Sequence, residues 1–137
     1  MTTEIKNLIS QYENKGDFTY SPISDEQLDA AQSLLNVILP TQYVDFLREY
    51  GHGGVGGVEV IGVGKDGTLL FVDETLKFRG YGMPLNLVVI ENCDEWIYCI
   101  NSFDGSIVSW SVDEIEEEYS DFDSYLLDRF MDAAENL

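Results

Sequence analysis

The residues that could carry out chemistry are few and scattered along the chain. The one histidine, His52, lies among glycines. A histidine that acts as a general base needs a Ser or Cys nucleophile nearby and a carboxylate to orient its ring. The sequence places no such group beside it. We therefore interpret His52 as a loop histidine whose ring nitrogens are satisfied by hydrogen bonds.

Metal and nucleotide sites lack the necessary residues or context. A tetrahedral zinc site needs four nitrogen or sulfur ligands, but the chain offers Cys93, Cys99, His52 and no CxxC motif. Residues 51–56 and 62–67 match GxGxxG, but a dinucleotide site needs a strand before that motif and a helix after it. The first motif follows a predicted helix and the second leads into a predicted strand. We expect no metal, no cofactor and reduced thiols.

Carboxylates form two groups that deserve separate interpretations. Asp94 and Glu95 precede a predicted strand. Neighbours on an extended chain point to opposite faces, so the two cannot flank one glycosidic bond, and we interpret them as a solvated turn. The run Asp113–Glu118 is interrupted only by Ile115 and lacks the oxygen pattern of a calcium loop. It is either a charged linker or a contact surface that attracts cations.

The overall charge narrows the classes of partner. The 137 residues carry a net charge of −19, and residues 71–137 hold 16 acidic and 3 basic side chains. Such a field repels phosphate, which argues against nucleic acid and anionic membranes, and it attracts basic proteins. An acidic surface that serves solubility alone is the alternative. Residues 1–14 lack the apolar core of a signal peptide, so we expect a cytoplasmic protein.

The helices that would position these groups have clear local signals. Pro40 suits the first turn of a helix, and Tyr43, Phe46, Leu47 and Tyr50 then fall on one stripe, which ends at a glycine-rich loop. Other predicted helices cover residues 3–14, residues 24–36 after a capping box of Ser24 and Gln27, and a C-terminal segment capped by Asp121 or Asp123 that packs Phe122, Leu126 and Phe130 inward.

Between these helices the apolar pattern alternates with a period of two. Glu95–Asn101 is apolar on both faces and should be the central strand, with Trp96 and, less strongly, Trp110 in the core. Asp73–Pro84 has no clean period and is predicted to be irregular. The short connections indicate antiparallel pairing. We predict a single α+β domain over residues 1–137 whose five strands are Val58–Val63, Thr68–Val72, Leu85–Glu91, Glu95–Asn101 and Ile107–Trp110.

Three stretches together resemble the SUKH superfamily: LPTQYVDFLREYG from Leu39, VVIENCDEWIYCINSFDGSIVSW from Val88, and SDFDSYLLDRFMDA from Ser120. The resemblance covers the chain from about Ser24 onward. The chain departs from the family pattern in one respect, because the loop that holds His52 contains more glycine than the usual family turn. The resemblance implies a non-catalytic α+β domain, most often a bacterial immunity protein that neutralises a toxin, frequently a nuclease. Eukaryotic relatives act as regulatory interaction modules.

These expectations combine into one hypothesis about function. We expect a cytoplasmic immunity protein whose acidic surface attracts a basic, nuclease-like toxin and whose folded domain covers the toxin's active site. The alternative is a regulatory scaffold domain that docks on another protein without any toxin. The sequence leaves the oligomeric state open. The residues predicted to form the electrostatic rim are Asp94, Glu95, Glu114, Glu116, Glu117 and Glu118.

Overall fold

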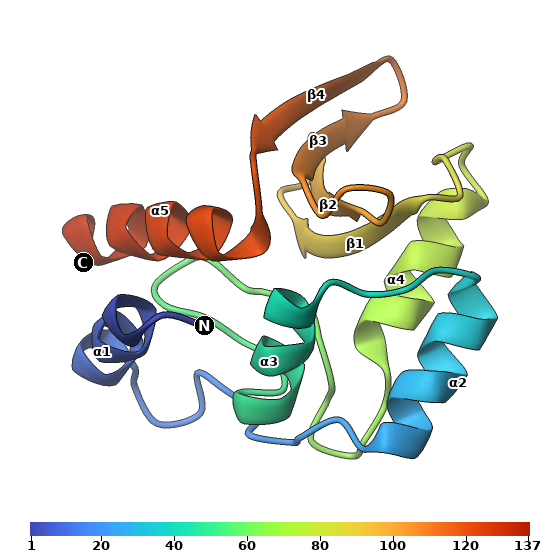
Figure 1. Cartoon of the computed structure of the whole chain (residues 1–137). Coiled ribbons are helices and arrows are strands. Elements are labelled where there is room, and N and C mark those ends of the chain that lie inside the picture. The colour runs from blue at the N-terminus through green and yellow to red at the C-terminus, as the bar shows by residue number, and fades with distance from the viewer.

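A computed structural model describes all residues, 1–137, as five helices and one four-stranded antiparallel sheet (Figure 1). The strands lie in the order β1-β2-β3-β4. The α+β class and the helices at both ends of the chain are confirmed. The helices and strands are α1 (Thr3–Tyr12), α2 (Asp25–Leu35), α3 (Thr41–Glu49), α4 (Leu70–Arg79), β1 (Leu87–Asn92), β2 (Ile97–Asn101), β3 (Ile107–Ser111), β4 (Glu114–Tyr119) and α5 (Phe122–Glu135).

The predicted helix starts are confirmed, and those of α2 and α5 are confirmed by their capping hydrogen bonds. In the capping box of α2, the Gln27 backbone N–H donates to Ser24 Oγ at 3.1 Å and the Ser24 N–H donates to Gln27 Oε1 at 3.0 Å. Pro40 is the N-cap of α3, and Asp121 caps α5 by accepting from the Ser124 N–H at 2.8 Å. These bonds satisfy backbone donors that the first turn of a helix leaves unpaired.

The apolar stripe of α3 lies at the centre of the hydrophobic core. Tyr43, Phe46 and Leu47 are fully buried, and the Tyr43 hydroxyl donates to the Ile61 carbonyl oxygen at 2.6 Å. Phe122 of α5 packs against Tyr43 with 5.3 Å between ring centroids. Helix α3 therefore joins the irregular segment after the glycine loop to α5.

The sheet is covered on both faces. On one face, Phe78 of α4 packs on Trp110 with 6.2 Å between centroids, and at the outer edge of β1 the Thr75 hydroxyl of the same helix accepts from the Val89 N–H at 3.0 Å. On the other face, Tyr125 of α5 packs on Tyr98 at 5.5 Å. β2 pairs with both β1 and β3, so its predicted central position is confirmed.

Two predicted strands are wrong. Val58–Val63 is extended and mostly buried, but it makes only isolated bridges through Val60 and Val63. Thr68–Val72 leads into α4 instead of a strand, and Asp73–Pro84, predicted to be irregular, contains most of that helix. The sequence of α4 has weak amphipathic character, and its N-cap Leu69 makes no side-chain capping bond. Packing of its buried side chains beside β1 therefore outweighs local preference.

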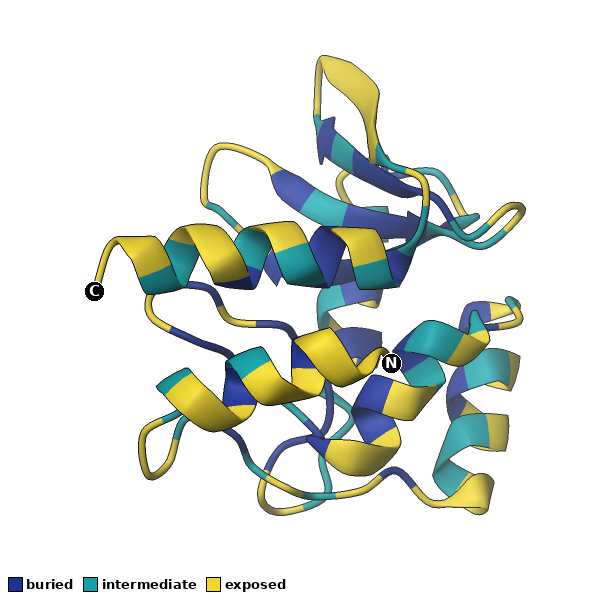
Figure 2. Ribbon diagram, turned by 60° about the vertical axis from the view of Figure 1, so that its left-hand side comes forward, coloured by how far each residue is buried: buried dark blue, intermediate teal, exposed yellow.

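Of the two interpretations of the acidic run Asp113–Glu118, a charged linker or a contact surface, the linker interpretation is wrong. Glu114–Tyr119 is β4, the edge strand that pairs with β3. Glutamate has a low preference for strands. The backbone hydrogen bonds of the hairpin with β3 compensate for this low strand preference. Figure 2 shows this strand exposed along most of its length while β2 and β3 alternate between buried and partly buried residues.

Candidate partner-binding surface

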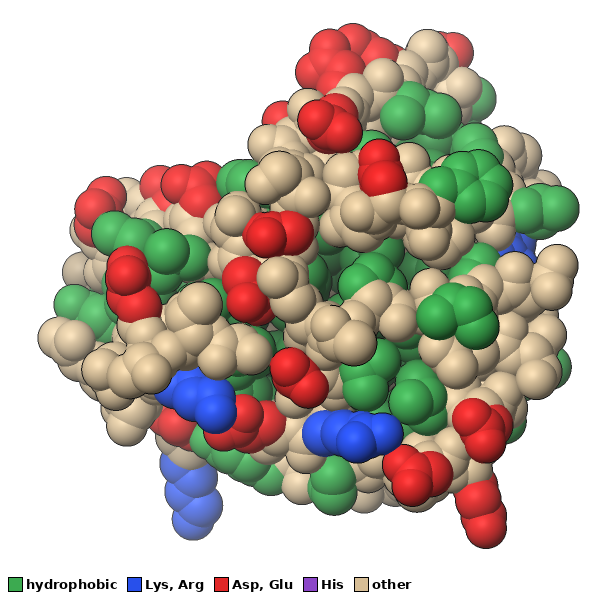
Figure 3. All heavy atoms as spheres, in the orientation of Figure 1, with side chains coloured by type: hydrophobic (Ala, Val, Ile, Leu, Met, Phe, Trp, Pro, Cys, Tyr) green, Lys and Arg blue, Asp and Glu red, His purple; other side chains and the backbone are tan.

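Two turns lie at the same end of the sheet. Ile97 of β2 pairs with Trp110 of β3, so the β1–β2 turn and the β3–β4 turn project from the same end. The first turn carries Asp94 and Glu95, and the second leads into Glu114. The fold thus brings residues about twenty positions apart in sequence to one edge of the molecule. In Figure 3, Asp and Glu side chains gather over the β3–β4 hairpin at the top of the view.

Within β4, alternate carboxylates share one face of the sheet. Glu116 pairs with Ser109 and Glu114 with Ser111, and the Ser109 hydroxyl donates to Glu118 Oε1 at 2.8 Å. The Glu114 carboxyl, through a hydrogen bond and through its charge, raises the pKa of the Glu116 carboxyl, and the charge of Glu118 adds to this effect. Glu114, Glu116 and Glu118 therefore form a row of like charges, which we call the acidic row.

Glu117 lies on the opposite face. It pairs with Val108, and Ile115 on the same face pairs with Trp110. The structure thus separates Glu117 from the acidic row, although the sequence analysis placed these residues together in one rim. Asp94 and Glu95 are exposed in their turn, as predicted. The Asp94 N–H donates to Asn92 Oδ1 at 2.8 Å, and Asp94 has a φ of 67°.

No basic side chain pairs with the carboxylates of this end of the sheet. The ion pairs of the chain use Asp45, Glu49, Asp25, Glu59, Glu74 and Glu91. None of these acids belongs to the predicted rim. The negative charge of the acidic row is therefore left for solvent cations or for a partner.

Trp96 corrects another expectation. It was predicted to be core, but 39% of its surface is exposed, whereas Trp110 is buried. Trp96 precedes β2 at the end of the sheet that carries the two turns, and its ring packs edge-on against Tyr98 at 6.3 Å. Alternation along a strand cannot distinguish a face covered by α5 from the part of that face that α5 leaves open. An exposed indole beside carboxylates is suited to contact with a partner.

Sequence reasoning missed the buried charge cluster below this surface. Glu91 of β1 is only 3% exposed, and its carboxylate accepts from the Tyr125 hydroxyl at 2.7 Å and from Arg129 Nε at 3.1 Å. The Arg129 guanidinium lies over the Tyr98 ring, 5.2 Å from its centroid. Burial and the nearby Glu91 charge raise the pKa of the Tyr125 hydroxyl. A glutamate directly after the apolar run LVVI was the available signal. We call this group the α5 clamp.

The two thiols lie in environments that suppress reactivity. Burial, followed by the charge of Glu91, raises the pKa of the Cys93 thiol to about 11. Cys99 is buried, and desolvation raises the pKa of its thiol above the usual value. Thiolate is the nucleophilic form, so neither side chain is an activated nucleophile.

His52 is satisfied, as predicted. Its Nδ1 accepts from the Gly62 N–H at 3.0 Å, and its Nε2 lies 2.7 Å from Glu59 Oε1. Since Nδ1 accepts, Nε2 carries the proton that is donated to Glu59. The surrounding glycines allow backbone segments to cross closely, because a Cβ on Gly53 would lie 1.9 Å from the Asp17 carbonyl oxygen. The glycine loop is thus explained by packing.

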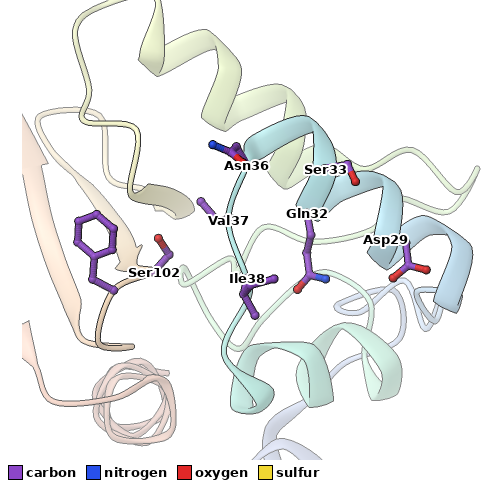
Figure 4. A pocket seen from close by; sticks show the side chains of 8 residues that line it. Asp29, Gln32, Ser33, Asn36, Val37, Ile38 and Ser102 are labelled. Atoms are coloured by element: carbon purple, nitrogen blue, oxygen red, sulfur yellow. The ribbon is translucent and has the colours of Figure 1, made fainter.

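A second surface feature lies at the C-terminal end of α2. A groove of about 580 Å³ is lined by residues of α2, the segment that follows it and the β2–β3 turn (Figure 4). Ile38 and Phe103, both in its lining, are 75% and 84% exposed. The polar groups in the lining include Gln32, whose Oε1 accepts from the Leu39 N–H at 2.9 Å. The groove is apolar enough to contact a partner and lacks a catalytic arrangement.

The chain is similar to known proteins in both sequence and fold. The sequence model of the family SUKH_5, described as SMI1-KNR4 cell-wall, matches residues 5–131. A crystal structure of a protein from Pseudomonas syringae pv. tomato has a similar fold, with a TM-score of 0.65 and 21% sequence identity over 84% of this chain and 89% of that chain. No group of three or more His, Cys, Asp or Glu side chains is arranged to hold a metal ion, and none of the helices has the length and apolar character to cross a membrane.

Proposed function

Because the chain belongs to the SUKH superfamily, we propose that it is a non-catalytic immunity protein that binds a basic, nuclease-like toxin in the cytoplasm and covers the toxin's active site. The observation that carries this proposal is the acidic row on β4, which begins at the end of the sheet that also carries the Asp94–Glu95 turn and has no basic partner within the chain.

The charge arrangement supports a fast encounter with a cationic protein. A toxin that binds nucleic acid presents Lys and Arg around its active site, because it must hold phosphate groups. A surface that concentrates carboxylates would attract the same residues and place the domain over that site. Electrostatic attraction of this kind raises association rates more than it raises affinity.

Affinity needs apolar anchors in addition to charge. Trp96 is the best candidate on this surface because it is exposed, aromatic and held by Tyr98. The acidic row would then border this aromatic anchor on one side, with β3 between them. This arrangement fits an interface with a desolvated centre and a charged border.

The test starts from the genome. A toxin encoded beside this gene should stop growth when expressed alone, and co-expression of this chain should restore growth. The purified pair should form a stable complex in which toxin activity is lost. Growth arrest that persists despite abundant folded protein, with no complex formed, would contradict the proposal.

The groove beside α2 favours a second candidate, a regulatory scaffold domain. Its exposed Ile38 and Phe103 could contact a cellular protein without any toxin. A matched pair of variants separates the candidates. Phe103→Ser should leave toxin neutralisation intact if the acidic surface is the binding site, while Trp96→Ser should weaken it.

A further inference from the structure

The outer edge of β4 is open along its length. β4 pairs only with β3, whereas the outer edge of β1 receives the Ile61 N–H, which donates to the Ile90 carbonyl oxygen at 2.8 Å. An open edge strand carries unpaired N–H and C=O groups and can accept a strand from another chain. The β4 edge is therefore the place where the sheet can be extended.

The hydrogen-bond pattern of the sheet identifies the backbone groups available at this edge. The Asn101 N–H donates to the Ser106 carbonyl oxygen at 2.8 Å, so Ser106 directs its backbone toward β2. The backbone N–H and C=O groups of successive residues in an antiparallel strand point to alternate sides, so those of Ser109 and Ser111 point toward β4. Their partners are Glu116 and Glu114. The backbone groups of Ile115 and Glu117 consequently point away from the sheet.

The side chains of β4 specify which strand would fit. The acidic row occupies one face, and Ile115, 51% exposed, lies with Glu117 on the other. A strand added here would place its alternate side chains beside these two faces. Lys or Arg at every second position would neutralise the acidic row, and apolar residues between them would cover Ile115.

The same charges disfavour a second copy of this chain. Pairing two β4 edges would bring two rows of glutamates together, and like charges on adjacent strands destabilise a sheet. The glutamates thus select against self-association and in favour of a cationic strand. Edge carboxylates that only prevent aggregation would show no such selectivity for a ligand.

From these observations we infer that β4 is a docking edge that accepts, by strand addition, an extended segment of a partner protein in which Lys or Arg alternates with apolar residues. The inference rests on the proposed function in so far as that partner is the toxin. It goes further, because it names the contact strand, the backbone groups and the sequence pattern of the segment that binds.

A synthetic peptide tests the edge without a toxin. The probe is a peptide of about ten residues with Lys at every second position and Val or Thr between. The control has the same composition with its Lys residues grouped together. At saturation, the alternating peptide should slow hydrogen exchange of the Ile115 and Glu117 amides at least about tenfold, and the control should not. Binding without this protection, equal protection by the control, or no binding would each overturn the inference.

A proline provides the matched variant. Glu117→Pro removes one outward N–H and leaves the inward bonds of β4 to β3 in place, since proline is tolerated on edge strands. Glu117→Gln removes the same charge and keeps the N–H. Glu117→Pro should bind the alternating peptide at least about tenfold more weakly than Glu117→Gln. Equal affinities would overturn strand addition, and the exchange measurement stays decisive if the proline variant does not fold.

The two proposals can fail separately. If the chain rescues growth from its toxin but the amides of Ile115 and Glu117 gain no protection from the alternating peptide, the immunity function stands and strand addition is wrong. If the peptide protects these amides but no neighbouring toxin is neutralised, the docking edge stands and the partner is of another kind.

Discussion

Glu91 and Glu116 lie on the two outermost strands of one sheet, β1 and β4, and they have opposite surroundings. Glu91 is buried in the α5 clamp and accepts hydrogen bonds from Tyr125 and Arg129. Glu116 is exposed in the acidic row, between two further glutamates and with no basic partner. A carboxylate with its partners inside the chain holds the fold together, whereas carboxylates without partners are available to another molecule. The comparison predicts that substitutions at the two sites affect different properties.

The largest effect should come from the α5 clamp. Glu91→Ala leaves the Arg129 guanidinium and the Tyr125 hydroxyl without their acceptor, and breaking a buried pair in this way costs about 3 kcal/mol or more of unfolding free energy. Chemical denaturation should show this loss. The association rate with a basic partner should change little in the fraction that remains folded. A loss below about 1 kcal/mol would show that the clamp does not hold α5 on the sheet.

The two tryptophans should separate stability from binding. Trp110→Ala removes a buried ring that packs on Phe78, and a cost of about 3 kcal/mol in unfolding free energy is expected. Trp96→Ala removes an exposed ring, so stability should fall by less than about 1 kcal/mol while binding of the toxin weakens by about 2 kcal/mol. Denaturation and calorimetry measure the two effects. Equal losses of stability for both variants would contradict the difference between the sites.

The smallest effect concerns acid titration of the acidic row. The pKa of Glu116 is raised in the folded chain, so the folded state binds protons more readily than the unfolded state and repulsion within the row weakens the fold above that pKa. Glu116→Gln should therefore raise the melting temperature slightly at about pH 7. The gain should vanish at about pH 3, where the carboxyl is protonated in both states. An equal gain at both pH values would contradict this explanation.

Local signals predicted the helices well because their determinants are close in sequence. Ser24 with Gln27, the Tyr43 stripe and the Asp121 cap each depend on neighbours within one or two turns. The prediction for the residues of α4 failed because burial beside β1 places Phe71, Val72 and Thr75, and the local sequence pattern does not encode that contact. The strand predicted at Val58–Val63 was wrong because an apolar run can be buried without pairing as a strand.

The candidate site was predicted in part for a related reason. The acidic residues were identified from composition, but their division between two faces required the pairing of β4 with β3, which places Glu117 opposite the acidic row. Trp96 was assigned to the core because alternation cannot reveal where α5 ends over the sheet. Glu91 and Arg129, 38 residues apart, meet only through tertiary packing.

One kinetic measurement tests the central claim most directly. It compares the association rate of the toxin with three proteins: the unaltered chain, Glu114/Glu116/Glu118→Gln, and a control with the same loss of charge on α1 and α5, Glu4→Gln with Asp132→Asn and Glu135→Gln. At low salt the acidic-row variant should associate at least about tenfold more slowly and with a flatter salt dependence, and the control should stay close to the unaltered chain. Equal rates for the acidic-row variant and the control would show that net charge, and not this surface, attracts the partner.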